Sequence, residues 1–279
     1  MSARHQLDTL EHLVLLTGEM SRMEYGFLFN HAQRQLAIGY NAGERRLDAS
    51  YYDLLASEAR LCNFVAIAQE ELPQESWFAL GRMLTTAGGE SALLSWSGSM
   101  FEYLMSLLVM PTFDNTLLDQ TYKAAVDRQI AYGEERGVPW GISESGYNAV
   151  DVQFNYQYRA FGVPGLGLKR GLAEDLVIAP YASMLALMIA PEAACRNLQQ
   201  LASEDLAGKF GFYEAVDYTP SRLRHGEARA VVRSFMSAKA PKGDSASPRP
   251  RPDSLAYVAS DSIVTTRPGR RRHAAIISG

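Results

Sequence analysis

The sequence predicts an all-α fold, an array of helical hairpins whose connecting loops carry the function. Segments of about 10–22 residues with apolar side chains at helical spacing alternate with substantial loops, and few segments show the alternation typical of strands. The composition is that of a soluble globular domain, with 47% hydrophobic and 21% charged residues among 279. We find no internal repeat of fixed period.

In the first third of the chain, the patterns predict three helices and a hairpin. Residues 50–70 form a helix with Ser50 as its N-cap, and residues 74–84 form a shorter helix. Two short alternating segments around a polar turn, 25–30 and 35–40, predict a small β-hairpin. Residues 3–23 are expected to be helical because their apolar residues form one stripe, which comprises Leu7, Leu10, Val14 and Leu15.

In the middle of the chain, helices are predicted over residues 99–109 and 115–136, the second ending at Gly137. A loop is expected over 137–148, and the alternation in 151–159 indicates a short strand. After a glycine-rich connection, the patterns predict three further helices, which are 179–190, 191–204 and 226–236.

The chain changes character at Ser237. Residues 1–236 have a net charge of −9, whereas residues 237–279 have a net charge of +5 and hold five of the twelve prolines. We therefore expect one domain over 1–236 and a disordered, basic tail over 237–279. Such a tail could bind nucleic acid or anionic lipid, and the alternative is a tail without selected structure.

The composition also excludes several classes of function for the body of the chain. A net charge of −4 argues against a nucleic-acid-binding protein. No secretory signal and no apolar stretch near the ~20 residues of a membrane span is visible, so we expect a cytoplasmic protein without membrane contact by this segment. The two cysteines, Cys62 and Cys195, are expected to be free thiols. The histidines are scattered, so we expect no metal and no cofactor.

Two short motifs resemble known sites without matching them. Residues 141–145 resemble a nucleophile elbow but lack its final glycine. Residues 165–171 resemble a dinucleotide-binding loop, but the glycine spacing differs and no β-α-β unit surrounds them. Neither motif is taken as a site.

Four segments combine acidic and aromatic residues, the mixture that sugar sites use because aromatic faces pack on pyranose C–H groups and carboxylates act as acid or base. Loop 137–148 contains Trp140, Glu144 and Tyr147, and an alternative is that Trp140 is a core anchor and Glu144 a surface charge. Glu58 lies on the helix predicted from Ser50 and could equally be a salt-bridged helix residue.

The third segment places Trp96 before a helix start and Glu102 in its first turn, where Glu102 could simply favour the helix dipole. The fourth segment, 211–222, adds Glu214 and neighbouring aromatic residues. The four segments together favour a carbohydrate cleft. The candidate substrate-binding residues are Trp96, Glu102, Tyr103, Trp140, Tyr147, Tyr213, Glu214 and Arg222.

These segments resemble a known family. Residues 51–60 (Tyr-Tyr-Asp-Leu-Leu-Ala-Ser-Glu-Ala-Arg) and 138–145 (Val-Pro-Trp-Gly-Ile-Ser-Glu-Ser) resemble the glucoamylase-like central domain of cyclic β-1,2-glucan synthases. Stretches 96–105, 158–181 and 213–222 also resemble this domain, and the resemblance extends from about Met23 to Met236.

The resemblance implies an (α/α)6 barrel, a cytoplasmic location within a large membrane-embedded synthase, and a β-glucan oligosaccharide or polysaccharide as partner. It also implies ring closure of β-1,2-glucan by anomer-retaining transglycosylation with two glutamates, which match Glu58 and Glu144. We favour Glu144 as acid/base and Glu58 as nucleophile, and the reverse assignment stays open.

Beyond Met236 the sequence departs from the family, which continues into further barrel helices. We therefore expect an incomplete barrel and interpret the tail, 237–279, as out-of-frame or remnant sequence. The alternatives to an enzyme are a non-catalytic glucan-binding or scaffold remnant, and a chain whose apolar flank prevents stable folding.

Overall fold

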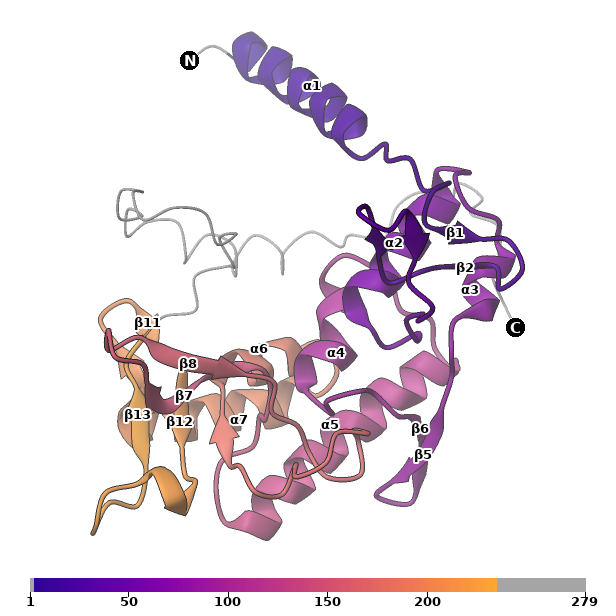
Figure 1. The fold of residues 1–279 in the computed structure, drawn as a ribbon. Helices are drawn as coiled ribbons and strands as arrows, with labels where there is room; N and C mark the ends of the chain where they lie inside the picture. The colour runs from indigo at the N-terminus through magenta and orange to yellow at the C-terminus, as the bar shows by residue number, and fades with distance from the viewer. Residues whose placement is uncertain (1–2, 235–279) are drawn as a thin grey trace.

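The computed structural model describes residues 3–234, in which helices and small sheets contribute to a common core (Figure 1). The longest helix, α5, crosses the middle of the molecule, and α1 extends away from the body (Figure 1). The α-helices are α1 (Ala3–Met20), α2 (Ser57–Ala68), α3 (Glu75–Ala79), α4 (Met100–Leu104), α5 (Leu117–Arg136), α6 (Pro180–Ala186) and α7 (Pro191–Leu201). Shorter helical turns are η1 (Met105–Leu108), η2 (Ala202–Leu206) and η3 (Pro220–Arg222).

The strands are short and form five two-stranded sheets and one three-stranded sheet among the described residues. The two-stranded pairs are β1 (Phe29–Asn30) with β2 (Gln35–Leu36), β3 (Tyr40–Asn41) with β4 (Arg46–Leu47), β5 (Leu84–Ala87) with β6 (Glu90–Leu93), β7 (Ser145–Val150) with β8 (Tyr156–Arg159), and β10 (Ala207–Gly208) with β11 (Gly211–Phe212). The three-stranded sheet is antiparallel, in the order β13 (Ala230–Val232), β12 (Ala215–Asp217) and β9 (Val177–Ile178).

The helix predicted over 115–136 is confirmed as α5, and its ends follow the local chemistry. Thr116 caps the first turn, since its hydroxyl accepts a hydrogen bond from the Asp119 backbone N–H at 3.2 Å. The helix stops at Gly137, which adopts the left-handed conformation with φ of 66°. Between these ends, Ala125 and Val126 are completely buried in the main core.

The other helix predictions hold with shifted boundaries. Residues 179–190 and 191–204 contain α6 and α7, and 99–109 contains α4 and η1. The helix expected from Ser50 begins only at Ser57, because the Asp53 carboxylate accepts hydrogen bonds from Leu55 N and Ala56 N in the turn before it. The N-terminal hairpin is confirmed as β1 and β2.

Two predictions are wrong. No helix forms over the described part of 226–236, where Ala230–Val232 instead pairs with Ala215–Asp217 as strand β13. Val231 and Val232 are β-branched and suit a pleated surface, and Val232 is completely buried. A second departure from the expected helices is the hairpin of β5 and β6, which turns at Gly88 and Gly89. The all-α description therefore applies to the helical part only, since small sheets complete the core.

Helix α1 contains no buried residue, so its apolar stripe is exposed in this structure. Among residues 3–234, no helix is long and apolar enough to cross a membrane. The predicted tail, 237–279, lies outside the described residues, and the domain boundary before it stays a prediction.

Candidate active site

A cavity of about 350 Å³ opens at the start of α2 and brings together residues from four separate segments. Its lining includes three glutamates, Glu58, Glu102 and Glu144, together with Trp96. The structure therefore places both predicted catalytic glutamates and two predicted substrate-binding residues around one space. The other lining residues are Ile38, Ser50, Tyr51, Tyr52, Asp53, Ala56 and Ser57.

Glu58 lies in the first turn of α2, next to the buried Ser57. The Ser57 hydroxyl donates to the Glu58 carboxylate at 2.8 Å. The Ser57 backbone carbonyl accepts a hydrogen bond from the Ser106 hydroxyl at 3.2 Å, which joins this turn to η1. The backbone that carries Glu58 is thus attached to the core by polar contacts.

Arg60 reinforces this attachment from a fully buried position on α2. Its guanidinium donates to Ser106 Oγ at 3.1 Å, to the Tyr122 hydroxyl at 3.3 Å and to the carbonyl of Tyr103 at 3.3 Å. Burial lowers the pKa of Arg60, although the nearby Tyr122 and Asp53 oppose this effect. The side chain fastens α2 to α4, η1 and α5, the elements around Glu58 and Glu102.

Glu144 follows a loop whose backbone forms hydrogen bonds with side-chain amides from two helices. Gln129 of α5 exchanges two hydrogen bonds of 2.8 Å with the backbone of Ile142. Asn197 of α7 does the same for Trp140, at 3.1 and 2.7 Å. These pairs satisfy backbone groups that a loop inside the core would otherwise leave without partners.

Two tyrosines contact Glu144 directly. The Tyr181 hydroxyl donates to the Glu144 carbonyl at 2.9 Å and lies 2.7 Å from Ser143 Oγ. The Tyr158 hydroxyl donates to the Glu144 carboxylate at 3.2 Å. Burial, and then the negative charge of Glu144, raises the pKa of Tyr158, so this phenol remains a hydrogen-bond donor at neutral pH.

Glu102 caps the helix on which it lies. Its carboxylate accepts from the Ser97 hydroxyl at 2.6 Å and from the Ser97 backbone N–H, and it forms a capping box with Ser99. The interpretation of Glu102 as a residue of the helix N-terminus thus holds, and the carboxylate also borders the cavity.

Trp96 is 65% exposed and lies at the wall of the cavity. Its loop is packed backbone to backbone on the loop of residues 162–167. A Cβ atom at Gly162 would lie 1.7 Å from the carbonyl oxygen of Ser97, and one at Gly167 would lie 2.6 Å from Gly98 N. Only glycine fits at these two positions, and the close approach fixes the backbone beside Trp96.

Two of the predicted substrate-binding residues are core residues instead. Trp140 is 7% exposed, and its Cβ lies so close to Gly133 that a Cβ there would be 2.8 Å away. Tyr103 is completely buried and donates to the carbonyl of Leu166 at 2.7 Å. Neither residue lines the cavity, and a sugar ring has no access to the buried Tyr103.

The remaining four predicted residues belong to the neighbouring sheet region and do not line the cavity. Arg222 forms ion pairs with Asp175 and Asp217, and its guanidinium lies 5.0 Å from the centre of the Tyr147 ring. Glu214 is buried beneath β7 and accepts from Gly146 N at 3.0 Å, and burial raises its pKa. The fourth, Tyr213, is half-buried beside Gly208.

Several residues at or near the cavity were not among the predicted site residues. Tyr52 and Asp53 immediately precede the helix of Glu58, and the paired acid and aromatic residues there are the signal that could have identified them. Tyr158 carries no such signal, because only the β7–β8 pairing brings it to Glu144. Lys169 lies near both Glu102 and Glu144, and burial lowers its pKa while these carboxylates oppose the effect.

Across residues 3–234, no cluster of three or more histidine, cysteine, aspartate or glutamate side chains has the arrangement of a metal site.

A family model described as Glycoamylase matches residues 50–240, which include the segments of all three glutamates. The chain belongs to this glucoamylase-like family. It is also 47% identical over 234 residues to the cyclic beta-(1,2)-glucan synthase NdvB of Rhizobium meliloti (strain 1021). That match covers 82% of this chain and 8% of the relative, so the chain spans a small part of that protein's length. The resemblance inferred from the sequence motifs is confirmed.

Solved structures of glucoamylase-like proteins share the fold. The endo-beta-1,2-glucanase of Talaromyces funiculosus in complex with sophorose superposes with a TM-score of 0.55 at 15% identity, covering 69% of this chain and 44% of that one. The endo-beta-1,2-glucanase of Chitinophaga pinensis superposes with a TM-score of 0.50 at 18% identity, covering 70% of this chain and 50% of that one. At these identities the likeness concerns the fold alone.

Proposed function

We propose that this chain is a carbohydrate-active domain that acts on β-1,2-linked glucan by anomer-retaining transglycosylation, including ring closure. The observation that carries the proposal is the convergence of Glu58, Glu102, Glu144 and the exposed Trp96 on one cavity. It is supported by the relatives described above, which are a cyclic beta-(1,2)-glucan synthase and endo-beta-1,2-glucanases.

For the fold, the proposal is that the described helices are part of an (α/α)6 barrel. The structural neighbours are glucoamylase-like proteins, and this chain covers 44–50% of their lengths. The cavity then corresponds to loops at one end of such a barrel, where residues from different helical hairpins meet.

Retaining chemistry requires one ionised carboxylate as nucleophile and one protonated carboxyl group as acid/base, about 5–5.5 Å apart. We assign Glu144 as nucleophile, because a phenol from a separate strand, Tyr158, orients its carboxylate, whereas the hydroxyl that donates to Glu58 belongs to the adjacent residue, Ser57. Glu58 then serves as acid/base. This reverses the assignment that the sequence favoured and keeps the same two residues.

In this scheme, Glu144 attacks the anomeric carbon of a glucosyl unit while Glu58 donates a proton to the departing glycosidic oxygen. Glu58 next removes a proton from the attacking 2-hydroxyl of an acceptor, which displaces Glu144 and restores the β-linkage. If the acceptor is the other end of the same chain, the product is a ring. Trp96 and Tyr52 offer exposed aromatic faces for pyranose stacking.

The test is incubation of the chain with linear β-1,2-glucan, followed by mass spectrometry of the products. A ring is lighter by one water than a linear chain with the same number of glucose units, so rings are distinguished from hydrolysis products. Glu58→Gln and Glu144→Gln should each reduce turnover by at least about 100-fold, since either change removes a reacting group. Glu90→Gln, an exposed change far along the chain from both glutamates, is the matched control.

Full turnover by either glutamine variant would overturn the assignment of the pair. Glucan binding without any product would instead support the alternative of a non-catalytic glucan-binding domain. Quenching or protection of Trp96 fluorescence, with Trp140 shielded in the core, would report such binding.

A further inference from the structure

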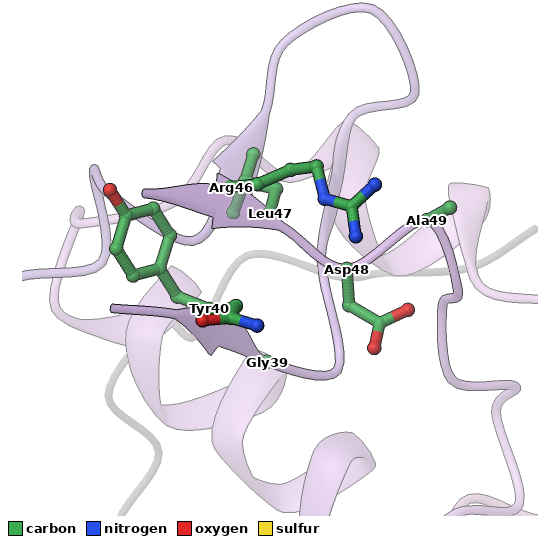
Figure 2. Close-up of a pocket in the computed structure, with 7 residues that line it drawn as sticks. Gly39, Tyr40, Arg46, Leu47, Asp48 and Ala49 are labelled. Carbon is green, nitrogen blue, oxygen red and sulfur yellow. The ribbon is translucent and has the colours of Figure 1, made fainter. Parts of the chain in front are cut away.

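A second cavity, of about 550 Å³, lies over the small ladder formed by β3 and β4 (Figure 2). The pairing register places Asn41 opposite Arg46, and Asp48 lies two residues further along on the face of Arg46. Figure 2 shows the Arg46 and Asp48 side chains next to each other and away from the Tyr40 ring. We call Gly39, Asn41, Arg46 and Asp48 the ladder site.

The floor of the ladder site is open at Gly39. Its backbone carbonyl accepts from Asp48 N at 3.0 Å, so the two residues face each other across the ladder. A Cβ atom at Gly39 would meet no other atom within 4 Å, and its backbone is not in the left-handed region. Neither the backbone conformation nor packing requires glycine here, and the effect of its missing side chain is to leave space.

The polar side chains of the ladder site keep hydrogen-bonding capacity for a ligand. Asp48 uses one carboxylate oxygen to accept from Ser50 N at 2.9 Å, and Asn41 uses its amide oxygen to accept from Glu44 N at 3.0 Å. The second oxygen of Asp48 and the amide nitrogen of Asn41 make no hydrogen bond with another residue among those described. Arg46 retains donors beside its pair with Glu44.

The charges of the ladder site select a neutral ligand. Arg46 is paired with Glu44 at 2.9 Å and lies beside Asp48, so no excess positive charge remains for a phosphate or carboxylate. A cation is disfavoured as well, because Asp48 is the one carboxylate in the lining and Arg46 lies next to it. Carboxylate, amide and guanidinium groups around an open floor suit a polyhydroxylated chain.

The linings of the ladder cavity and of the active-site cavity are adjacent along the chain. Ile38 and Ser50 line the active-site cavity, while the adjacent residues Gly39 and Ala49 line the ladder cavity. A glucan that is bound at Glu58 and Glu144 and is long enough to extend past these two junctions would contact the ladder site.

We propose that the ladder site is an additional glucosyl-binding subsite, which holds the β-linked glucan beyond the active-site cavity. The inference rests on the proposed function of that cavity and deepens it. It assigns the selection of long chains to a part of the protein that precedes the helix of Glu58. A short oligosaccharide fills the active-site cavity alone, whereas a long chain contacts both.

The experiment is isothermal titration of the full chain with the β-1,2-linked glucose disaccharide and with linear β-1,2-glucan, comparing wild type with Gly39→Val. The valine fills the ladder site without a predicted clash. We expect the affinity for the disaccharide to be unchanged and that for linear glucan to fall about tenfold, through loss of one to two net hydrogen bonds. Asp48→Asn, which keeps the shape, should also weaken binding of linear glucan only.

Gly26→Val is the matched control, because Gly26 likewise has open space and no left-handed backbone but lies outside both cavities. It should bind both ligands as the wild type does. The subsite is overturned if Gly39→Val binds linear glucan as tightly as the wild type while the disaccharide still binds. If the wild type binds neither ligand, the proposed function fails as well, and the two failures are thus distinguishable.

Discussion

At the scale of single residues, the two candidate catalytic glutamates differ in their hydroxyl donors, which are the adjacent Ser57 for Glu58 and the Tyr158 phenol for Glu144. The phenol reaches the carboxylate from strand β8, and its distance of 3.2 Å is that of a moderate hydrogen bond. Such a donor holds the nucleophilic carboxylate in one orientation. The contact depends on sheet pairing between residues 14 positions apart, so sequence spacing gave no indication of it.

Tyr158→Phe should reduce turnover of linear β-1,2-glucan about tenfold or more, because a hydrogen bond to a charged group is worth roughly 1.5–3 kcal/mol. The measurement is the initial rate of product formation from linear β-1,2-glucan. Tyr156→Phe on the same strand is the control, since the Tyr156 hydroxyl has no hydrogen bond to a described residue. Equal rates for both variants would show that the contact has no catalytic role.

Glu214 gives a prediction about pH and stability. Burial raises its pKa in the folded state, and the hydrogen bond from Gly146 N opposes this only in part. A raised pKa means that the folded state binds the proton more tightly, so the stabilising contribution is complete below the unfolded pKa and is lost as pH rises through the folded value. Glu214→Gln stays neutral and keeps an amide oxygen as acceptor.

The free energy of unfolding of Glu214→Gln should therefore decrease less than that of the wild type between about pH 4 and pH 7. Urea denaturation at several pH values measures both curves. If the free energies of unfolding of the variant and the wild type change in parallel over this range, ionisation of Glu214 does not destabilise the folded state.

At the scale of elements, helices α5, α6 and α7 each send one polar side chain to the loop before Glu144. Those side chains are Gln129, Tyr181 and Asn197. The loop is consequently part of the core although it has no regular structure, and its residues Ile142 and Ser143 are buried. The hydrogen bonds from these three helices therefore fix the position of the backbone at Glu144.

Asn197→Ala should destabilise the protein by about 2–4 kcal/mol, since it removes both hydrogen bonds to the Trp140 backbone and one to Ser183 Oγ. Chemical denaturation followed by circular dichroism measures the change. Gln199→Ala, on an exposed position of the same helix, should remain within about 0.5 kcal/mol of the wild type. A loss of less than 1 kcal/mol for Asn197→Ala would show that the loop is held by packing alone.

The elements that sequence periodicity predicted well are those with local signals. Helix α5 has a threonine cap and a terminal glycine, and its limits were found almost to the residue. Strand β13 had no such signal, because it depends on pairing with β12, which is 13 or more residues away in the sequence. The prediction of a helix there was wrong for this reason. In so short a segment, the apolar residues fit the helical period of about 3.6 residues and the strand period of about 2 equally well.

The candidate site was predictable to a similar extent. Acidic and aromatic residues in four segments pointed to the right regions, and Glu58, Glu102, Glu144 and Trp96 do line one cavity. Composition alone did not distinguish Trp96 from Trp140, since both lie in loops with a glutamate. Gly133 decides the difference, because its missing side chain admits Trp140 against α5.

At the scale of the whole molecule, α1 is separate from the packed body (Figure 1). None of its residues is buried, so it contributes no apolar burial to the stability of residues 21–234. Its contribution to the fold can therefore be tested by removal.

A chain that begins at Ser21 should melt within about 2 °C of the full chain, because a change in the free energy of unfolding below 1 kcal/mol shifts Tm by only a few degrees. Thermal unfolding followed by circular dichroism measures this. A decrease of 10 °C or more would indicate that the apolar stripe of α1 is packed against the remainder of the chain in solution.

The glycine contacts beside Trp96 have a consequence for the timescale on which the cavity wall moves. Amide groups of Ser95, Leu168 and Lys169 are hydrogen-bonded across the two loops that Gly162 and Gly167 bring together. Neither loop can open without breaking these bonds, so deuterium should enter both at one common rate, close to that of helix α5. The wall that presents Trp96 to a sugar would then behave as a fixed surface during many binding events, and selection among glucans would depend on its shape.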